Sequence, residues 1–379
     1  MTARSFPVSV PMALPITPGV PRRLAPGGVV RSARFRAHAS FRDVRAFLAA
    51  LALLAAAPGS APVYRVLRSL PVGGEGGWDY VALDPEARLL YVPRSTHVAV
   101  LDLEGHVRGE VADTPGVHGV ALARDENLGF ASNGRGNTVT VFQLSPLRRL
   151  EDVATTGENP DAIVFDPATR RVFTLNGRGR NATALDARTR RVVGTIPLGG
   201  KPEFAVADGD GHLFANIEDT SELVRIDTRA LVVEARWSLR PLQSPTGLAL
   251  DRSRKRLFSV AGNRLMAVVD AESGRLLSTL PIGEHADAAA YDPGTGRAFS
   301  SNGDGTLTVV EREGADGYRV EAQLATKVGA RTMALDPGTH LLYLPTARFE
   351  PAPAPTPEQP RRRPQPVAGT FEIVVVGPG

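Results

Sequence analysis

The chain has 379 residues, of which 42% are hydrophobic and 22% charged, and it contains no cysteine. Disulfides and thiolate-held metal clusters are therefore excluded. The formal charge of +4 is unevenly placed, because residues 1–61 carry eight arginines and one acid, whereas the rest carries 36 basic and 39 acidic side chains. The basic excess belongs to the N-terminal segment, and the remainder carries no strong signal for nucleic-acid binding.

An apolar run follows the basic segment. Arg45 precedes Ala46–Ala57 (AFLAALALLAAA), and small residues continue to Ala61. This order is typical of a secretory signal, and the run is shorter than the about 20 residues that a bilayer span requires. We expect residues 1–61 to be an N-terminal extension with a bacterial Sec-type signal, and the mature protein to be periplasmic or secreted without a membrane span. The alternative is a buried or frayed N-terminal helix.

One pattern recurs from about Val72 onward. A polar residue opens an apolar run that ends in Asp-Pro or its equivalent, and a basic turn and a second apolar run follow. Clear copies begin at Trp78 (WDYVALDPEARLLYV), Pro160 (PDAIVFDPATRRVFTL) and Ala286 (ADAAAYDPGTGRAFSS). An aromatic recurs at the same phase, every 39 to 44 residues, at Tyr91, Phe130, Phe173, Phe214, Phe258, Phe299 and Tyr343.

Each repeat contains four short apolar runs separated by turn residues, which is a strand signal. Four strands in a period of about 40 to 45 residues describe one blade of a WD40-like β-propeller. The seven copies predict an all-β, seven-bladed propeller of four-stranded antiparallel blades over residues 62–379. The last copy ends at its third strand, residues 370–376, and residues 63–70 (VYRVLRSL) supply the missing outer strand. We expect this N-terminal strand to complete the last blade and close the ring.

One insertion interrupts the pattern. Residues 348–367 (RFEPAPAPTPEQPRRRPQPV) separate the second and third strands of the seventh blade. Their proline density favours an extended polyproline-II conformation. Two interpretations stay open: a docking arm for a protein partner, or a Pro-rich loop lying over one mouth of the ring.

The repeat resembles the YVTN-repeat β-propeller family, also described as YncE-like. The likeness is strongest in the fourth copy, from Ile196 (IPLGGKPEFAVADGDGHLFANIEDTSELVRIDT), and in LYV at Leu90–Val92. The resemblance covers residues 63–377 and implies an exported propeller without an assigned activity. It also suggests kinship with seven-bladed lactonases and with propeller subunits of periplasmic dehydrogenases, although no motif of either transfers residue by residue.

The candidate site lies at the mouth of the central channel, which the first strand of each blade lines. The position five before each Asp-Pro equivalent is polar in every repeat: Asp79, His118, Asp161, Glu203, Thr246, Asp287 and Arg331. The next hairpin of three blades adds Asn133, Asn176 and Asn302. Such a set can hold a divalent cation through oxygen ligands, clamp a cationic or polyhydroxylated ligand, or supply a general base to a bound water. The alternative is a solvated polar rim.

Three functions follow from this pattern. We expect a monomeric, noncatalytic binding or scaffold protein of the periplasm that takes a small-molecule ligand, a cation or a protein partner at the mouth. The alternatives are a metal-assisted hydrolase of the lactonase type and a noncatalytic subunit of a periplasmic redox complex. Propellers host all three, so the fold does not choose between them. The first predicts binding without turnover, the second metal-dependent hydrolysis, and the third co-purification with a cofactor-bearing chain.

Overall fold

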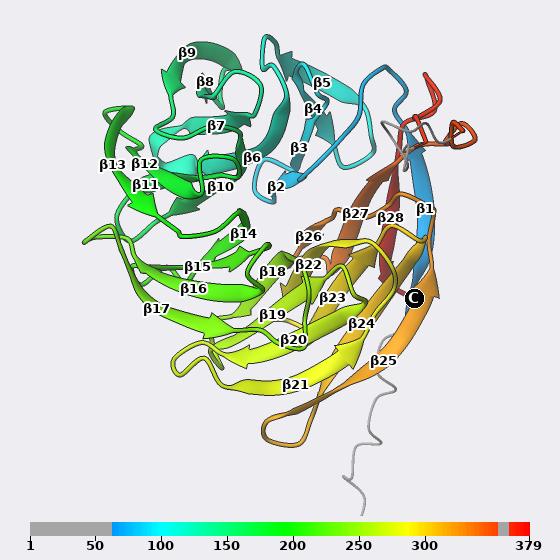
Figure 1. The fold of residues 1–379 in the computed structure, drawn as a ribbon. Coiled ribbons are helices and arrows are strands. Elements are labelled where there is room, and N and C mark those ends of the chain that lie inside the picture. Colours follow the sequence, from blue (N-terminus) through cyan, green and yellow to red (C-terminus); the bar gives the residue numbers. More distant parts are fainter. Residues whose placement is uncertain (1–62, 355–363) are drawn as a thin grey trace, which may run out of the picture. The chain divides into compact units, whose positions relative to one another are not determined.

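Seven small antiparallel sheets make up the protein. The structure, a computed structural model, describes residues 63–354 and 364–379. This part of the chain forms seven four-stranded sheets and one short 3-10 helix, η1 (Arg124–Glu126). The first strand of each sheet contacts the first strands of both neighbouring sheets, all the way round a ring (Figure 1). The prediction of an all-β, seven-bladed propeller is confirmed, whereas the secretory segment in residues 1–61 lies outside the described residues and remains a prediction.

The blades are numbered in chain order, and the strands of each blade are given from the channel outward. Blades 1 and 2 contain β2 (Ala82–Asp84), β3 (Leu89–Pro93), β4 (Val98–Asp102), β5 (Val107–Val111), and β6 (Val117–Ala123), β7 (Leu128–Asn133), β8 (Thr138–Gln143), β9 (Arg148–Ala154). Blades 3 and 4 contain β10 (Pro160–Asp166), β11 (Arg171–Asn176), β12 (Asn181–Asp186), β13 (Arg191–Pro197), and β14 (Pro202–Ala207), β15 (His212–Ile217), β16 (Glu222–Asp227), β17 (Val232–Ser238). Blades 5 and 6 contain β18 (Pro245–Asp251), β19 (Arg256–Ala261), β20 (Leu265–Asp270), β21 (Leu276–Pro281), and β22 (Ala286–Asp292), β23 (Arg297–Asn302), β24 (Thr306–Glu313), β25 (Gly317–Ala325). Blade 7 contains β26 (Ala334–Asp336), β27 (Leu341–Thr346), β28 (Glu372–Pro378) and β1 (Tyr64–Pro71).

The repeated aromatic of the second strand belongs to the core of every blade. All seven of these side chains are at most 3% exposed. In blade 5, Phe258 stacks on Tyr291 of blade 6 with ring centroids 5.4 Å apart and planes 9° from parallel. Burying one such ring contributes about 1.5 to 3 kcal/mol, so the aromatic that defines the repeat also holds the blades together.

A strand from the start of the described chain closes blade 7. Strand β1 pairs antiparallel with β28, from Tyr64 opposite Pro378 to Pro71 opposite Glu372. Tyr64 is 3% exposed, and its ring packs edge-on against Phe299 of blade 6 at 4.9 Å between centroids. The predicted closure by the N-terminal strand is confirmed.

Buried aspartates at the ends of the first strands join neighbouring blades. Asp166 is 0% exposed and accepts hydrogen bonds from a backbone N–H of its own turn at 3.2 Å and from Thr228 Oγ1 of blade 4 at 2.7 Å. Asp292 is also 0% exposed, and its Oδ2 lies 2.8 Å from His340 Nδ1 in blade 7 and 3.3 Å from the hydroxyl of Tyr64 in β1. Each carboxylate therefore completes its own turn and ties in the next blade.

The insertion between β27 and β28 begins and ends as a short ribbon. Phe349 and Pro366 form an antiparallel bridge, with one backbone hydrogen bond on either side. The ring of Phe349 lies 5.9 Å from the ring of Trp78, the residue before Asp79. The stem of the insertion thus stands beside the predicted mouth residues. Residues 355–363 lie outside the described residues, so the docking-arm interpretation stays a prediction.

We expect deletion of residues 63–70 to reduce solubility and to lower the free energy of unfolding by several kcal/mol in urea titrations. The deletion removes the ladder between β1 and β28 and the buried ring of Tyr64, and both contributions are lost together. Deletion of residues 351–364 is the control and should cost little, because surface loops contribute few buried contacts. A larger loss from the loop deletion would contradict the closing role of β1.

The substitution Asp292→Ala should lower the free energy of unfolding by about 3 kcal/mol, because it leaves the buried hydroxyl of Tyr64 and the partly buried imidazole of His340 without their acceptor. Urea titration monitored by tryptophan fluorescence measures this loss. Asp125→Ala is the matched control, because Asp125 is exposed in η1 and should change stability by less than about 0.5 kcal/mol. Equal effects of the two substitutions would show that Asp292 does not join the blades.

Candidate functional site

The seven predicted mouth residues take equivalent places in the seven blades. We call them the mouth ring, and they are Asp79, His118, Asp161, Glu203, Thr246, Asp287 and Arg331. In blades 2 to 6 each is the second residue of the first strand. In blades 1 and 7 the first strand has only three residues, and the ring residue precedes it. All seven are partly exposed, so the structure brings them to one end of the innermost strands within reach of solvent.

Hydrogen bonds from the preceding blade hold the backbone of the mouth ring. Four ring carbonyls each accept a bond of 2.5 to 3.0 Å from a buried side chain one blade away. These bonds run from Ser132 to Asp161, from Asn216 to Thr246, from Ser301 to Arg331 and from Thr332 to Asp79. Sequence analysis missed these four supports. A usable signal existed for Ser132, Asn216 and Ser301, which are polar residues two places after the repeated aromatic in otherwise mostly apolar strands.

His118 is shared by two carboxylates of the ring. Its Nδ1 lies 2.7 Å from Asp79 Oδ2 and 3.5 Å from Asp161 Oδ1. The three side chains come from blades 1, 2 and 3 and are 15 to 29% exposed. Asp161 therefore has no cation of its own at closer range and competes with Asp79 for one imidazolium.

The other two ring carboxylates have their own cations. Arg331 Nε lies 3.1 Å from Asp287 Oδ2. Lys201 Nζ lies 3.1 Å from Glu203 Oε2 and also contacts the carboxylate of Glu218. Sequence analysis missed Lys201, which lies in the loop before β14. This group carries one positive charge between two negative ones, so the glutamate side of the mouth is also short of cations.

Burial and crowding keep protons in the mouth. Desolvation raises the pKa of Asp161, and the charge of Asp79 raises it further against the opposing effect of His118. Desolvation and the charge of Asp161 raise the pKa of Glu203. Burial alone would lower the pKa of His118, but its hydrogen bond to Asp79 and the charge of Asp161 outweigh burial and raise the pKa to about 9. His118 is therefore cationic at neutral pH, and the mouth retains carboxyl protons that a solvated site would release.

Two aromatic side chains form a floor beneath the mouth ring. Tyr80 follows Asp79 in blade 1, is 8% exposed, and donates its backbone N–H to the carbonyl of His118 at 3.0 Å. Its ring lies 4.8 Å from the ring of Phe204, which follows Glu203 in blade 4. Blades 1 and 4 lie three places apart in the ring of seven, so this contact crosses the channel. No pattern in the sequence indicated this contact across the channel.

The three asparagines predicted beside the ring lie inside the blades. Each is 0% exposed, so none offers an atom to a ligand, and we do not retain them as ligand contacts. Each amide donates to a threonine hydroxyl of the following strand at 2.8 to 3.1 Å, in the pairs Asn133–Thr140, Asn176–Thr183 and Asn302–Thr308. The Asn-Gly turns therefore use the asparagine to fasten their own hairpin.

A metal ion would find three candidate ligands in the mouth. Asp79, His118 and Asp161 each place one donor atom within 4.8 Å of the others. The Nδ1 of His118 is the atom concerned in both ion pairs, and its raised pKa means that a metal must first displace a proton. The oxygen atoms of the two aspartates suit hard divalent cations better than the imidazole does. The geometry fits an oxygen-bound cation at the aspartates more closely than a histidine-bound transition metal.

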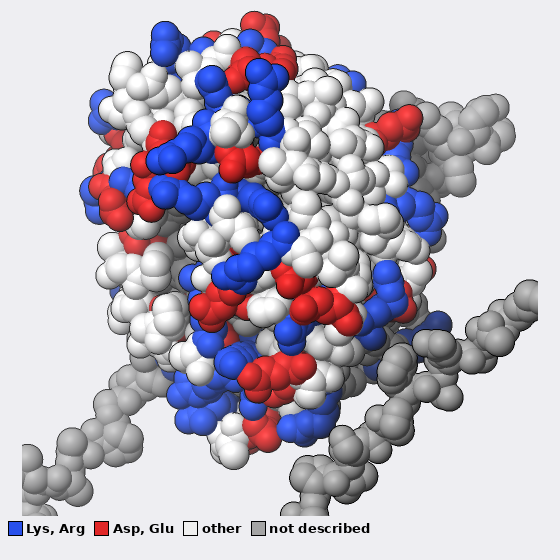
Figure 2. All heavy atoms as spheres, turned by 90° about the vertical axis from the view of Figure 1, so that its left-hand side faces the viewer, with Lys and Arg blue, Asp and Glu red and all other residues white. Residues whose placement is uncertain are grey.

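The outer side of blades 3 and 4 carries mixed charge. Figure 2 shows basic and acidic side chains interspersed on the side that carries β13 and β17 at the left of Figure 1. Ion pairs there include Arg225 with Glu234 at 2.9 Å and Arg236 with Glu222 at 2.8 Å. This side does not present the single-sign surface that follows a phosphate backbone.

Comparison with known proteins supports the fold class. No protein-family model matches the chain, and no curated protein matches it in sequence. A chain of Kuenenia stuttgartiensis hydrazine synthase is similar, with a TM-score of 0.62 and 14% identity over 76% of this chain and 95% of that chain. A chain of the mitotic checkpoint complex has a TM-score of 0.65 and 14% identity over 83% and 95% of the two chains. The corresponding values for U3-55K are 0.65 and 10%, over 84% and 99%.

These likenesses define the class of protein: a seven-bladed, WD40-like β-propeller. At such identities they show the fold alone and say nothing of ligand or activity. None of the helices in the described residues is long and apolar enough to span a membrane.

The raised pKa values of the mouth predict how stability depends on pH. His118 stabilises the fold fully below its unfolded pKa of about 6.5, and this contribution is lost as the pH rises through about 9. Asp161 and Glu203 hold protons in the folded state at a pH where the unfolded chain has released them. All three groups therefore make the free energy of unfolding fall as the pH rises from about 4 to 9.

Urea titrations across this range measure the fall. We expect a shallower decline in the double variant Asp161→Asn with Glu203→Gln, whose amides cannot ionise. The control, Glu311→Gln with Glu313→Gln on the outer strand pair of blade 6, should decline as the wild type does. Parallel curves for all three proteins would mean that the mouth carboxyls titrate as ordinary solvated groups.

Proposed function

We propose that this chain is a noncatalytic binding propeller that holds the cationic group of a small ligand at the mouth ring. The proposal rests on one observation, the surplus of carboxylates over cations at the mouth ring. In the ion pairs of the described residues, the five carboxylates Asp79, Asp161, Glu203, Asp287 and Glu218 meet three cations, His118, Lys201 and Arg331. Further positive charge beside Asp161 and Glu203 would reduce this surplus and would take the place of protons that these two groups retain.

The floor supports a small ligand that enters from solvent. Tyr80 and Phe204 meet across the channel next to the ring, so a bound molecule would contact an aromatic side chain while its charge meets the carboxylates. A cation on an aromatic face gains about 0.5 to 2 kcal/mol. The supported ring backbone keeps the carboxylates in position before the ligand arrives, which lowers the ordering cost of binding.

Binding without turnover fits this mouth better than hydrolysis. A general base has to accept a proton near neutral pH, whereas the carboxylates on both sides of His118 keep it protonated. Its Nδ1 is also occupied by Asp79. A lactonase-type reaction would need another base, so we place the hydrolase second to the binding function.

The family and the cellular setting belong to the same proposal. We infer membership of the YVTN-repeat, YncE-like propellers from the repeat itself, together with export to the periplasm or beyond from the apolar run after Arg45. A protein partner fits the Pro-rich insertion, whose stem stands beside the mouth. We expect the mature chain to be a monomer, because its closed ring leaves no blade incomplete.

Thermal unfolding with added cations tests the mouth. A divalent ion such as Ca²⁺ and a primary ammonium such as ethanolamine form the two arms, because both can supply the missing charge. A ligand at a hundredfold excess over its Kd stabilises the fold by about 2.7 kcal/mol, and the melting temperature should rise accordingly. The rise should be absent in Asp161→Asn with Glu203→Gln and unchanged in Glu311→Gln with Glu313→Gln.

The arm that responds identifies the source of the charge. If neither arm stabilises the wild type, the mouth is a solvated rim and the proposal fails. If a response survives in the double variant of the mouth, the cation binds elsewhere and the proposal also fails.

A further inference from the structure

A cavity lies at the other end of the innermost strands, away from the mouth ring. It has a volume of about 250 Å³ and opens between blades 4 and 5, where the β14–β15 turn and the β18–β19 turn follow the ends of the first strands. The mouth ring lies at the beginning of those same strands, so the two places are on opposite faces of the propeller. The volume is just below the roughly 300 Å³ at which pockets for small molecules begin, which limits the cavity to a small metabolite.

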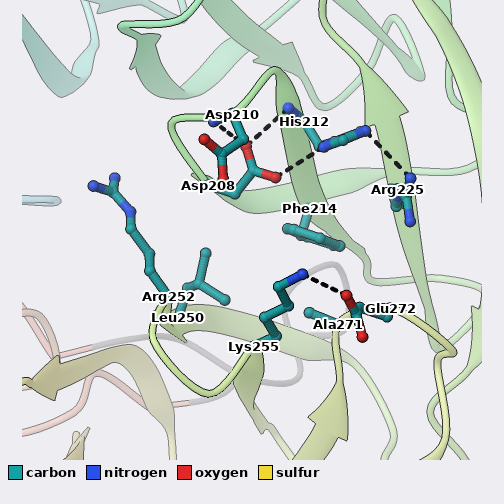
Figure 3. A pocket seen from close by; sticks show the side chains of 10 residues that line it. All are labelled: Asp208, Asp210, His212, Phe214, Arg225, Leu250, Arg252, Lys255, Ala271 and Glu272. Carbon is teal, nitrogen blue, oxygen red and sulfur yellow. Dashed lines mark hydrogen bonds and ion pairs between the residues drawn. The ribbon is translucent and has the colours of Figure 1, made fainter.

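The floor of the cavity is apolar. Phe214 lies at its centre, and Leu250 and Ala271 complete the apolar lining (Figure 3). One wall is made rigid by Arg225, whose Nε lies 2.9 Å from Glu234 and whose Nη2 lies 3.2 Å from Nε2 of His212. These polar groups are bonded to one another, so this wall limits the shape of the cavity and does not offer an unpaired charge to a ligand.

The turn of blade 4 supplies negative charge. Asp208 accepts hydrogen bonds from the backbone N–H groups of Asp210 and His212 at 2.7 and 2.9 Å, and its Oδ2 lies 2.8 Å from His212 Nδ1. Its oxygen atoms are therefore engaged within the turn. Asp210 lines the cavity, and no other described residue forms an ion pair or a hydrogen bond with its exposed carboxylate.

The turn of blade 5 supplies positive charge across the cavity. Arg252 donates one N–H to the carbonyl of Ala207 at 3.0 Å, and no described carboxylate pairs with its guanidinium. Lys255 pairs with Glu272, but these side chains are 59% and 65% exposed, and such exposed pairs contribute little. Both basic side chains can turn toward a ligand at small cost. Figure 3 shows them rising from one turn while Asp208 and Asp210 lie in the turn opposite.

The two charged sides act on each other through the cavity. The pKa of Lys255 is raised first by its partner Glu272, and the charges of Asp210 and Asp208 add to that effect. No described ion pair joins the two turns across this space. A molecule that fits between them would meet a cationic side, an anionic side and an apolar floor at once.

We propose that this cavity binds a small zwitterion, an α-amino acid with an apolar side chain. Its carboxylate would take the free N–H groups of Arg252 and the ammonium of Lys255, since arginine matches a carboxylate with two parallel hydrogen bonds. Its ammonium group would face Asp210, and its side chain would cover Phe214 and Leu250. The site is independent of the mouth ring and needs no residue of it.

Leucine and two analogues with the same apolar body test the zwitterion by calorimetry on the full mature chain. Leucinamide lacks the carboxylate, and 4-methylpentanoate lacks the ammonium group. We expect leucine to bind and each analogue to bind at least about tenfold more weakly, the cost of losing one charge-assisted contact. Failure of leucine to bind, or equal binding of either analogue, overturns the proposal.

Matched variants locate the site. Arg252→Gln and Asp210→Asn should each weaken leucine at least about tenfold while melting as the wild type does without ligand. Arg254→Gln is the control, because Arg254 lies in the same turn and pairs with Asp251 at 3.6 Å outside the cavity lining. The mouth variant Asp161→Asn with Glu203→Gln should keep leucine binding. If the mouth variant loses leucine binding and Arg252→Gln keeps it, leucine binds at the mouth and the proposed cavity site is overturned. The thermal unfolding with cations tests the mouth independently of this result.

Discussion

Most blades of this propeller carry a buried carboxylate at the end of the first strand, as Asp84, Asp166, Asp251, Asp292 and Asp336 show. A carboxylate removed from water is costly unless hydrogen bonds and counter-charges surround it. Here those partners come from two places, the strand's own turn and the next blade, as at Asp166 and Asp292. The first strands that end in these two aspartates are thus held at their far ends by a neighbouring blade, and moving that blade would break the contact.

Contacts between neighbouring blades also hold the opposite end of the first strands. Side chains of the preceding blade hold the carbonyls of ring residues, so the mouth inherits its geometry from the packing of the whole ring. The carboxylates of the mouth cannot move apart to reduce their mutual repulsion, and they reduce it instead by holding protons. This is why burial and repulsion act on the pKa of Asp161 and Glu203 together, and why the proposed cation would take the place of protons at the mouth.

The sequence was sufficient for the fold and for half of the site. Seven aromatics at one phase of the repeat defined the blades, and the missing last strand required β1 to close the ring. The position five residues before each Asp-Pro equivalent defined the mouth ring. Contacts between distant blades could not be predicted in this way, because no local pattern relates Tyr80 to Phe204 across the channel. The hairpin asparagines were misplaced for a different reason: a polar side chain beside a turn can satisfy itself inside the blade as Asn133 does.

The contact between Tyr80 and Phe204 places two aromatic side chains in the channel next to the mouth ring. A ring of seven blades would ordinarily leave an axial passage, but here two side chains from opposite blades meet in it. A molecule at the mouth would therefore meet these two rings before it could travel further along the channel. Exchange between the two faces of the molecule along the channel would have to pass this contact, so the position of two side chains bears on any passage through the ring.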